Sequence, residues 1–320
     1  MPPPTAHAPA LPDPVFEVRD LSVHAGPAEI AAHVSLTLRP GRMTALVGES
    51  GCGKSLTAAA LGDLLPAGLA STAAAPFALR AGPHGLAYVF QDPGVHLNPV
   101  LTVRAQIAEA LAAAGVPRAA RKARILDLLE RVGLPDPPRV AASYPHQLSG
   151  GMQQRAMIAM ALALSPRVLV ADEPTTALDV TVQARILDLL RHLQVTENLA
   201  VLLITHNLGV VAQVADDMAV MYAGRIVEQG PVPLVLRQAA HPYVHALLRA
   251  LPTLRGTAPG ALLQEIPGRV PPPGSRPPGC RFAPRCPAAT PECSAAEPPL
   301  AAIHPGAVPP HLAACLHPMP

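Results

Sequence analysis

The sequence predicts an α/β protein built around a parallel β-sheet. Short apolar runs alternate with helix-like stretches from residue 15 to about residue 232, and each run ends at turn-forming or charged residues. Near the start of this part, one apolar run is joined to a helical pattern by a glycine-rich loop. Because strands that are buried on both faces read as continuous apolar runs, we expect a parallel sheet with helices on both sides.

Four apolar runs are the predicted strands of this sheet. In chain order they are MTALVG, GLAYVF, RVLVAD and LAVLLIT. Between the second and the third lies a helix-rich block, residues 101–165, whose segment ARKARILDLLERVGL has apolar residues at helical spacing.

The two ends of the chain are rich in proline. Residues 1–14 contain six prolines, and we expect them to be disordered. Residues 253–320 hold 17 of the 41 prolines of the chain. Because proline interrupts helices and sheets, we expect this tail to lack regular structure and to be either disordered or held by cross-links.

The composition excludes several classes of function. The hydrophobic fraction is 50%, but no apolar run reaches the roughly 18 residues that span a bilayer. The N-terminus lacks the basic-then-apolar order of a signal peptide, which favours a cytosolic protein. A net charge of +2 and an aromatic content of 2% argue against nucleic-acid binding.

The segment GESGCGKS, residues 48–55, matches the phosphate-loop pattern and stands between a predicted strand and a predicted helix. Glycines let backbone N–H groups turn toward phosphates, and the helix N-terminus adds positive potential. Lys54 is expected to reach the β- and γ-phosphates, and the Ser55 hydroxyl to bind Mg²⁺. The other candidate nucleotide-binding residues of the loop are Gly48, Glu49, Ser50, Gly51, Cys52 and Gly53.

Two adjacent carboxylates follow the third predicted strand in RVLVADEP, residues 167–174. In phosphoryl transfer one carboxylate holds Mg²⁺ and another polarises the attacking water. Asp172 is suited to the first role and Glu173 to the second.

The segment LSGGMQQR, residues 148–155, resembles the signature motif of ABC transporter ATPases. Other motifs of this family occur in the expected order: Gln91 in FQDP resembles the Q-loop, Asp179 in TTALD the D-loop, and His206 in ITHN the switch histidine. The resemblance covers residues 15–232. It implies an ABC ATPase cassette with additional antiparallel N-terminal strands, a helical subdomain at about residues 92–165, and a separate C-terminal region at 233–320.

The resemblance also implies how the site works. Two cassettes of this family enclose ATP head to tail. Catalysis would then involve Glu173, His206 and Gln91, and Mg²⁺ would be bound by Ser55, Gln91 and Asp172. Ser149, Gly150 and Gly151 would contact the nucleotide held by the partner cassette, and Asp179 would lie at the shared site.

One departure from the family concerns adenine recognition. The family usually has an aromatic residue ahead of the phosphate loop, but none lies between Phe16 and that loop, where His24 and Ala25 are near the usual place. The preference for ATP over GTP can therefore be loose.

Finer matches resemble the "D-type" ATPases of oligopeptide and dipeptide importers, a group that includes nickel and glutathione importers. They lie at residues 90–103, 144–163, 172–187 and 241–252. The resemblance implies a peripheral location at the cytoplasmic face of the membrane. The implied partners are two permeases, a solute-binding protein and a second, "F-type" ATPase.

Three alternatives to peptide import stay open at this point. The cargo can be nickel or another small solute. A soluble ABC ATPase acting on nucleic acid or ribosomes would usually have two cassettes or a coiled-coil insertion, and this chain shows neither. A poorly hydrolytic regulatory subunit would not need both Glu173 and His206.

Four of the five cysteines occur in the last 41 residues, with the spacing C-x5-C-x6-C-x21-C. They are Cys280, Cys286, Cys293 and Cys315. Because a cytosolic protein should not keep structural disulfides, these residues suggest a metal centre, with a 4Fe–4S cluster as the first expectation. Zinc, with His304, His311 or His317 as further ligands, and the absence of any metal are the alternatives.

Overall fold

The computed structural model describes residues 11–74, 85–176, 178–250, 266–304 and 306–319. Most of the N-terminal segment that the sequence predicts to be disordered, residues 1–10, lies outside the described residues. The helices and strands follow the alternation expected from the sequence. The strands are β1 (Phe16–Ala25), β2 (Ala28–Leu38), β3 (Met43–Val47), β4 (Leu69–Thr72), β5 (Leu86–Val89), β6 (Val168–Asp172), β7 (Ala200–Thr205), β8 (Asp217–Tyr222), β9 (Arg225–Pro231), β10 (Ala301–His304) and β11 (His311–Ala313).

The α-helices fall into three groups. Those on the sheet are α1 (Lys54–Leu61), α7 (Val180–Thr196), α8 (Leu208–Val214), α9 (Val232–Arg237) and α10 (Pro242–Arg249). Those of the helical region are α2 (Pro93–His96), α3 (Val103–Ala113), α4 (Arg118–Arg131), α5 (Pro137–Ala142) and α6 (Gly150–Leu162). The C-terminal tail contains α11 (Pro291–Ala295), and short 3-10 turns occupy Pro145–Gln147 and Ala283–Arg285.

The main sheet has eight strands in the order β10-β11-β9-β8-β3-β7-β6-β5. The run β8-β3-β7-β6-β5 is parallel, and it includes the four strands predicted from the sequence. At the other edge β9, β11 and β10 pair antiparallel. A second, antiparallel sheet has the order β2-β1-β4. The predicted α/β fold, with a parallel core and antiparallel N-terminal strands, is confirmed.

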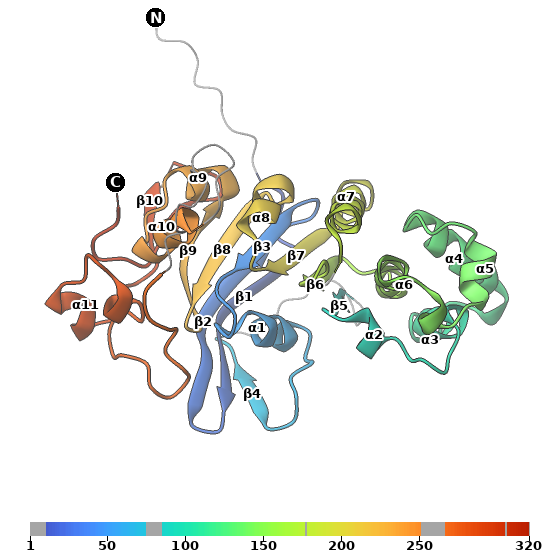
Figure 1. The fold of residues 1–320 in the computed structure, drawn as a ribbon, viewed down its shortest axis with the longest axis horizontal. Helices are drawn as coiled ribbons and strands as arrows, with labels where there is room; N and C mark the ends of the chain where they lie inside the picture. The colour runs from blue at the N-terminus through green and yellow to red at the C-terminus, as the bar shows by residue number, and fades with distance from the viewer. Residues whose placement is uncertain (1–10, 75–84, 177, 251–265, 305, 320) are drawn as a thin grey trace, which may run out of the picture.

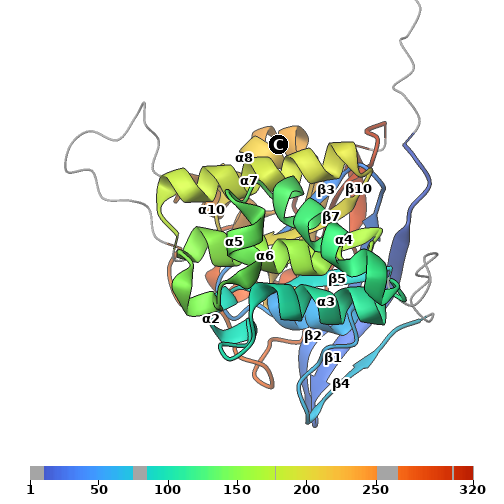
Figure 2. The same cartoon turned by 90° about the vertical axis from the view of Figure 1, so that its right-hand side faces the viewer.

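The parallel core is buried on both faces, and β7 shows how. Ala200, Leu202 and Ile204 belong to the apolar core shared with the three-stranded sheet and α1. Val201 and Leu203 belong to the core shared with the helical region. This alternation is the period of two that a strand imposes on its side chains. The helical region and the C-terminal tail lie at opposite ends of the molecule (Figure 1), and α3 to α6 stand in front of β5 and β7 in Figure 2.

The expectation that the proline-rich tail lacks regular structure is wrong. Two tail strands, β11 and β10, extend the main sheet beyond β9, and α11 is a short helix. The prolines lie where a missing N–H costs little: Pro291 is in the first turn of α11, and Pro299 and Pro310 precede the two strands. Proline count alone does not report these positions.

None of the described helices is long and apolar enough to cross a bilayer.

Candidate functional site

The phosphate loop connects the end of β3 to the start of α1, as its motif requires. Gly48 has φ +156°, and a side chain there would lie 2.1 Å from the carbonyl oxygen of Met221. Gly53 has φ +105° and forms the N-cap of α1. Only glycine is free of strain at both positions, so the loop can curve tightly beside β8.

Lys54 is 5% exposed, and its side chain lies inside the phosphate loop, where it contacts the loop backbone. Its ammonium Nζ donates hydrogen bonds to the carbonyl oxygens of Gly48 at 2.9 Å and Glu49 at 3.0 Å. It also lies 3.7 Å from the sulfur of Cys52, a buried thiol whose pKa is raised by burial. A cation held by two carbonyl oxygens can exchange them for phosphate oxygens.

Asp172, at the end of β6, lies beside the start of α1. The Ser55 hydroxyl donates to its Oδ1 at 3.1 Å, and the Tyr88 hydroxyl donates to its Oδ2 at 2.8 Å. Burial raises the pKa of Asp172, while the hydrogen bonds from Tyr88 and Ser55 act to lower it. A carboxylate and a hydroxyl at this spacing are hard oxygen ligands, so the pair fits Mg²⁺. The role of Tyr88 as a donor to Asp172 was not predicted from the sequence.

Glu173 follows directly and has a different environment. Its backbone has φ +43°, which is unusual for a residue with a side chain, and its N–H donates to the carbonyl oxygen of Ile204 at 2.9 Å. Its carboxylate accepts from Thr176 at 2.9 Å and lies 3.1 Å from Nδ1 of His206. Burial acts to raise the pKa of Glu173, but the hydrogen bonds to His206 and Thr176 outweigh it and hold the pKa below its usual value.

Gln91 completes this group from the segment that follows β5. Its side-chain nitrogen donates to Oε2 of Glu173 at 3.3 Å. In this structure Gln91 is therefore a partner of Glu173, while its predicted contact with Mg²⁺ stays a prediction. The structure brings together Gln91, Asp172, Glu173 and His206 with Ser55, from four separate segments of the chain. Thr176, within the quoted TTALD motif, was not assigned a role from the sequence.

The signature residues lie elsewhere, at the start of α6 in the helical region. The Ser149 hydroxyl caps α6 by accepting from the N–H of Met152 at 3.4 Å. A side chain at Gly151 would lie 2.6 Å from Val182, and one at Gly150 3.4 Å from Leu178. Asp179 caps α7 by accepting from Val182 N–H at 2.9 Å. The described neighbours of the signature thus come from the D-loop side of α7, not from the phosphate loop.

The cysteines of the tail do lie together: Cys280, Cys286, Cys293 and Cys315 line one cavity of about 10 Å³. However, within the described parts of the chain, no group of three or more His, Cys, Asp or Glu side chains could hold a metal ion. The expectation of a 4Fe–4S cluster is therefore wrong, and the zinc alternative has no support.

The four thiols of the tail are buried or partly buried. Burial raises the pKa of Cys280 and Cys286, and that of Cys315 to about 11, so these thiols are neutral at pH 7 in the metal-free chain. The three histidines are also engaged elsewhere. His311 pairs with Glu228, His304 stacks on His311, and His317 hydrogen-bonds to Thr290.

Comparisons with known proteins identify the family of the chain. The profile of the ABC transporter family matches residues 31–176, and that of the oligopeptide/dipeptide transporter C-terminal region matches residues 227–293. A putative peptide import ATP-binding protein of Brucella ovis is 46% identical over 79% of this chain and 82% of its own length. The dipeptide transport ATP-binding protein DppD of Haemophilus influenzae is 45% identical over 86% of this chain and 88% of its own.

Solved structures show the same fold. The protein cbiO1 of Clostridium perfringens, part of an ABC transporter complex, superposes with a TM-score of 0.59 at 25% identity, covering 70% of this chain and 91% of its own. The ATP-binding cassette MJ0796, seen as a dimer in a post-hydrolysis state with ADP and phosphate, gives 0.56 at 26% identity, covering 68% and 98%.

Proposed function

The chain belongs to the ABC transporter ATP-binding family, and we propose that it is the ATP-hydrolysing subunit that energises an importer of dipeptides or oligopeptides. The observation that carries hydrolysis is the Glu173 carboxylate, which His206 and Thr176 hold beside the pair formed by Ser55 and Asp172. The peptide cargo is supported by the printed names of the relatives and by the match of residues 227–293 to the transporter C-terminal region.

ATP would bind to the phosphate loop in the conformation described above. The loop amides and α1 N-terminus favour the phosphates, and Lys54 exchanges its two carbonyl partners for phosphate oxygens. Ser55 and Asp172 would hold Mg²⁺, which supplies charge neutralisation of the phosphates when bound. Gln91 donates to the Glu173 carboxylate, the group proposed to activate water.

Hydrolysis would use the Glu173 carboxylate, which is ionised at neutral pH, as the general base. Glu173 accepts a proton from water as the water oxygen bonds to the γ-phosphorus, and the bond from that phosphorus to the bridging oxygen of ADP breaks. His206 and Thr176 position the carboxylate and restrict its rotation.

A second cassette would complete the site. Because Ser149 and Gly151 lie at the start of α6 in the helical region, we propose that they contact ATP bound to a partner cassette. Permease subunits are the membrane partners that an import ATPase requires. We propose a peripheral position at the cytoplasmic face of the membrane, with a solute-binding protein on the other side. The expected pairing with an "F-type" ATPase has no support in the comparisons and is not retained.

Steady-state ATP turnover of the complex assembled with its permeases tests the assignment of Glu173. We expect Glu173→Gln to lower turnover by about a hundredfold or more, the usual size of a general-base effect, while ATP still binds. Asp188→Asn, which changes an exposed carboxylate on α7, is the matched control and should leave turnover unchanged. Equal turnover in the Glu173→Gln and unmodified complexes would refute the assignment. Peptide-stimulated turnover that another solute does not produce would support the cargo.

A further inference from the structure

Three side chains hold the three polar groups of Glu49, the second residue of the phosphate loop. Its backbone N–H donates to the Tyr243 hydroxyl at 3.1 Å. Its carbonyl oxygen accepts from Lys54, as described above. Its carboxylate accepts from Nη1 of Arg285 at 3.2 and 3.3 Å. Two of the three holding residues, Tyr243 and Arg285, come from outside the cassette, 194 and 236 residues further along the chain.

Arg285 is itself held in one orientation. Its side chain is 6% exposed, and its guanidinium donates to the carbonyl oxygens of Pro267 at 2.8 Å and Ile266 at 3.1 Å. The same Nη1 that contacts Glu49 lies 3.3 Å from the Tyr222 hydroxyl. Because the fork of N–H groups is planar and rigid, satisfying its other donors fixes where the Glu49 carboxylate must lie.

An aromatic cluster supports this arrangement. The rings of Tyr222, Tyr243 and Phe282 are buried, with centroids 4.6 to 5.4 Å apart. The Arg285 guanidinium carbon lies 5.7 Å from the Tyr222 ring centroid and 5.9 Å from that of Phe282. Tyr222 ends β8, the neighbour of the loop-bearing strand β3, so the cluster links the sheet to the tail.

Two physical effects follow for a nucleotide. A glycine-rich loop is flexible, and ordering it on binding costs conformational entropy. If the loop is already ordered before ATP arrives, this cost does not reduce the binding free energy. An unpaired Glu49 carboxylate would also repel the phosphates, whereas Arg285 neutralises it. Both effects favour tight binding, and both depend on Arg285.

We infer that the C-terminal region is a working part of the nucleotide site, with Arg285 and Tyr243 as positioning residues that hold Glu49 and preorganise the phosphate loop. The inference rests on the proposed binding of ATP by this loop. It assigns to the tail a role that the phosphate-loop motif itself does not contain.

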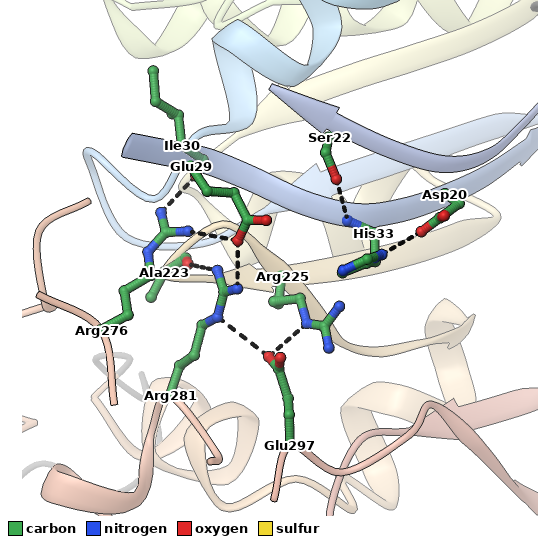
Figure 3. Close-up of polar contacts among 10 residues, drawn as sticks. All are labelled: Asp20, Ser22, Glu29, Ile30, His33, Ala223, Arg225, Arg276, Arg281 and Glu297. Carbon is green, nitrogen blue, oxygen red and sulfur yellow. Dashed lines mark hydrogen bonds and ion pairs between the residues drawn. The ribbon is translucent and has the colours of Figure 1, made fainter. Parts of the chain in front are cut away.

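A second arginine of the tail provides the matched control. Arg281 has a 9% exposed side chain and donates to Glu29 at 2.8 Å and to the carbonyl oxygen of Ala223 at 2.7 Å. It also pairs with Glu297 at 3.2 Å. Figure 3 shows these contacts, which join the tail to the β1–β2 side of the molecule. Arg281 and Arg285 are thus two buried tail arginines that each donate to a carboxylate and to a backbone carbonyl, but only Arg285 contacts the phosphate loop among the described contacts.

The test measures the dissociation constant of Mg-ADP and the thermal midpoint of unfolding without nucleotide, on the full chain. We expect Arg285→Gln to weaken Mg-ADP binding by about tenfold, the size of one hydrogen bond to a charged group. Arg281→Gln should change Mg-ADP binding less than about twofold, even if it lowers the thermal midpoint of unfolding as much as Arg285→Gln does. Arg285→Lys should recover part of the affinity because it restores the charge but not the fork.

A double-mutant cycle tests whether Arg285 acts on nucleotide binding through Glu49. Once Arg285→Gln is present, Glu49→Gln should weaken binding little further, because the two residues act as one pair. Tyr243→Phe removes only a hydroxyl, and it should weaken Mg-ADP binding about threefold. This variant tests the inference if Arg285→Gln does not fold. Equal Mg-ADP affinity in the Arg285→Gln and Arg281→Gln chains, or independent effects of Glu49→Gln and Arg285→Gln, would overturn the inference. Failure of the unmodified chain to bind Mg-ADP would instead refute the proposed function.

Discussion

The helical region, residues 93–162, and the C-terminal region, residues 233–320, are attached to the sheet in different ways. The helical region packs through an apolar core, to which Ile107, Leu128 and Leu129 contribute. The C-terminal region packs through an apolar core as well and adds buried hydrogen bonds, including that between Glu228 and His311. Apolar packing has no preferred direction, whereas hydrogen-bonded charges permit one geometry. The comparison teaches that the signature lies on a region joined to the sheet mainly by apolar packing, while the phosphate loop also receives directional hydrogen bonds from the C-terminal region.

The largest expected effect tests a buried hydrogen-bonded pair that joins the C-terminal region to the sheet. Glu228 and His311 are both fully buried, 2.8 Å apart, and Glu228 also accepts from the N–H groups of Ala240 and His241. His311→Ala leaves this carboxylate without its side-chain partner, and should lower the free energy of unfolding by about 3–5 kcal/mol. Denaturant titration measures the loss. His304→Ala, at a partly exposed neighbour, should cost about 1 kcal/mol or less, and equal losses would contradict the argument.

The next effect tests the apolar attachment of the helical region. Leu128 is fully buried, so Leu128→Ala should cost about 2–5 kcal/mol through a cavity. Hydrogen exchange should then speed up in α3 to α6 while the tail strands keep their protection. Val195→Ala, at a side chain that is 68% exposed on α7, is the control and should change stability by about 0.5 kcal/mol or less. Equal loss of protection in both regions would break the comparison.

A third effect is a pH dependence that belongs to the C-terminal region. Burial lowers the pKa of His241 to about 3, so this residue is neutral in the folded chain. The unfolded state binds the proton from about pH 6.5 downward, so this stability is complete above that pH and falls as the pH drops toward 3. The expected loss is about 2 kcal/mol between pH 7 and pH 5. His241→Asn, which can still cap α10, should flatten this slope, and an unchanged slope would exclude His241 as the cause.

The smallest effect concerns a charged contact of the helical region. Arg131 and Glu197 form an ion pair with side chains that are 24% and 35% exposed. Because solvent screens such a pair, Arg131→Gln should cost about 0–1 kcal/mol, and less at high salt. A loss as large as that of His311→Ala would mean that the helical region is also held by charges.

The features that could be predicted from the sequence are those encoded in short, continuous segments of the chain. The phosphate loop, the acidic pair Asp172-Glu173 and His206 were predicted because each lies in a short motif directly after a strand. Parallel strands bring such ends to one edge of a sheet, so local motifs are sufficient to assemble the centre of the site. The strands themselves were predicted from continuous apolar runs.

What was missed depends on contacts between distant segments. Arg285 and Glu49 are 236 residues apart, and no spacing rule joins them. Tyr88 lies within a predicted strand, but its donation to Asp172 depends on strand order. For the cysteines, the spacing suggested a metal site, whereas burial and thiol geometry decide whether ligands are available. Sequence spacing reports neither.

The tyrosines of the chain give the nucleotide site an optical property. There is no tryptophan, and of the four tyrosines three have already been placed: Tyr88 on Asp172, and Tyr222 and Tyr243 around Glu49 and Arg285. The fourth, Tyr144, lies in the helical region ahead of the signature. Because the chain has no indole to take up their excitation, its ultraviolet emission comes from these four tyrosines, three of which lie at or beside the proposed nucleotide site. We expect this emission to change when nucleotide binds, and stopped-flow mixing can test the expectation without any attached dye.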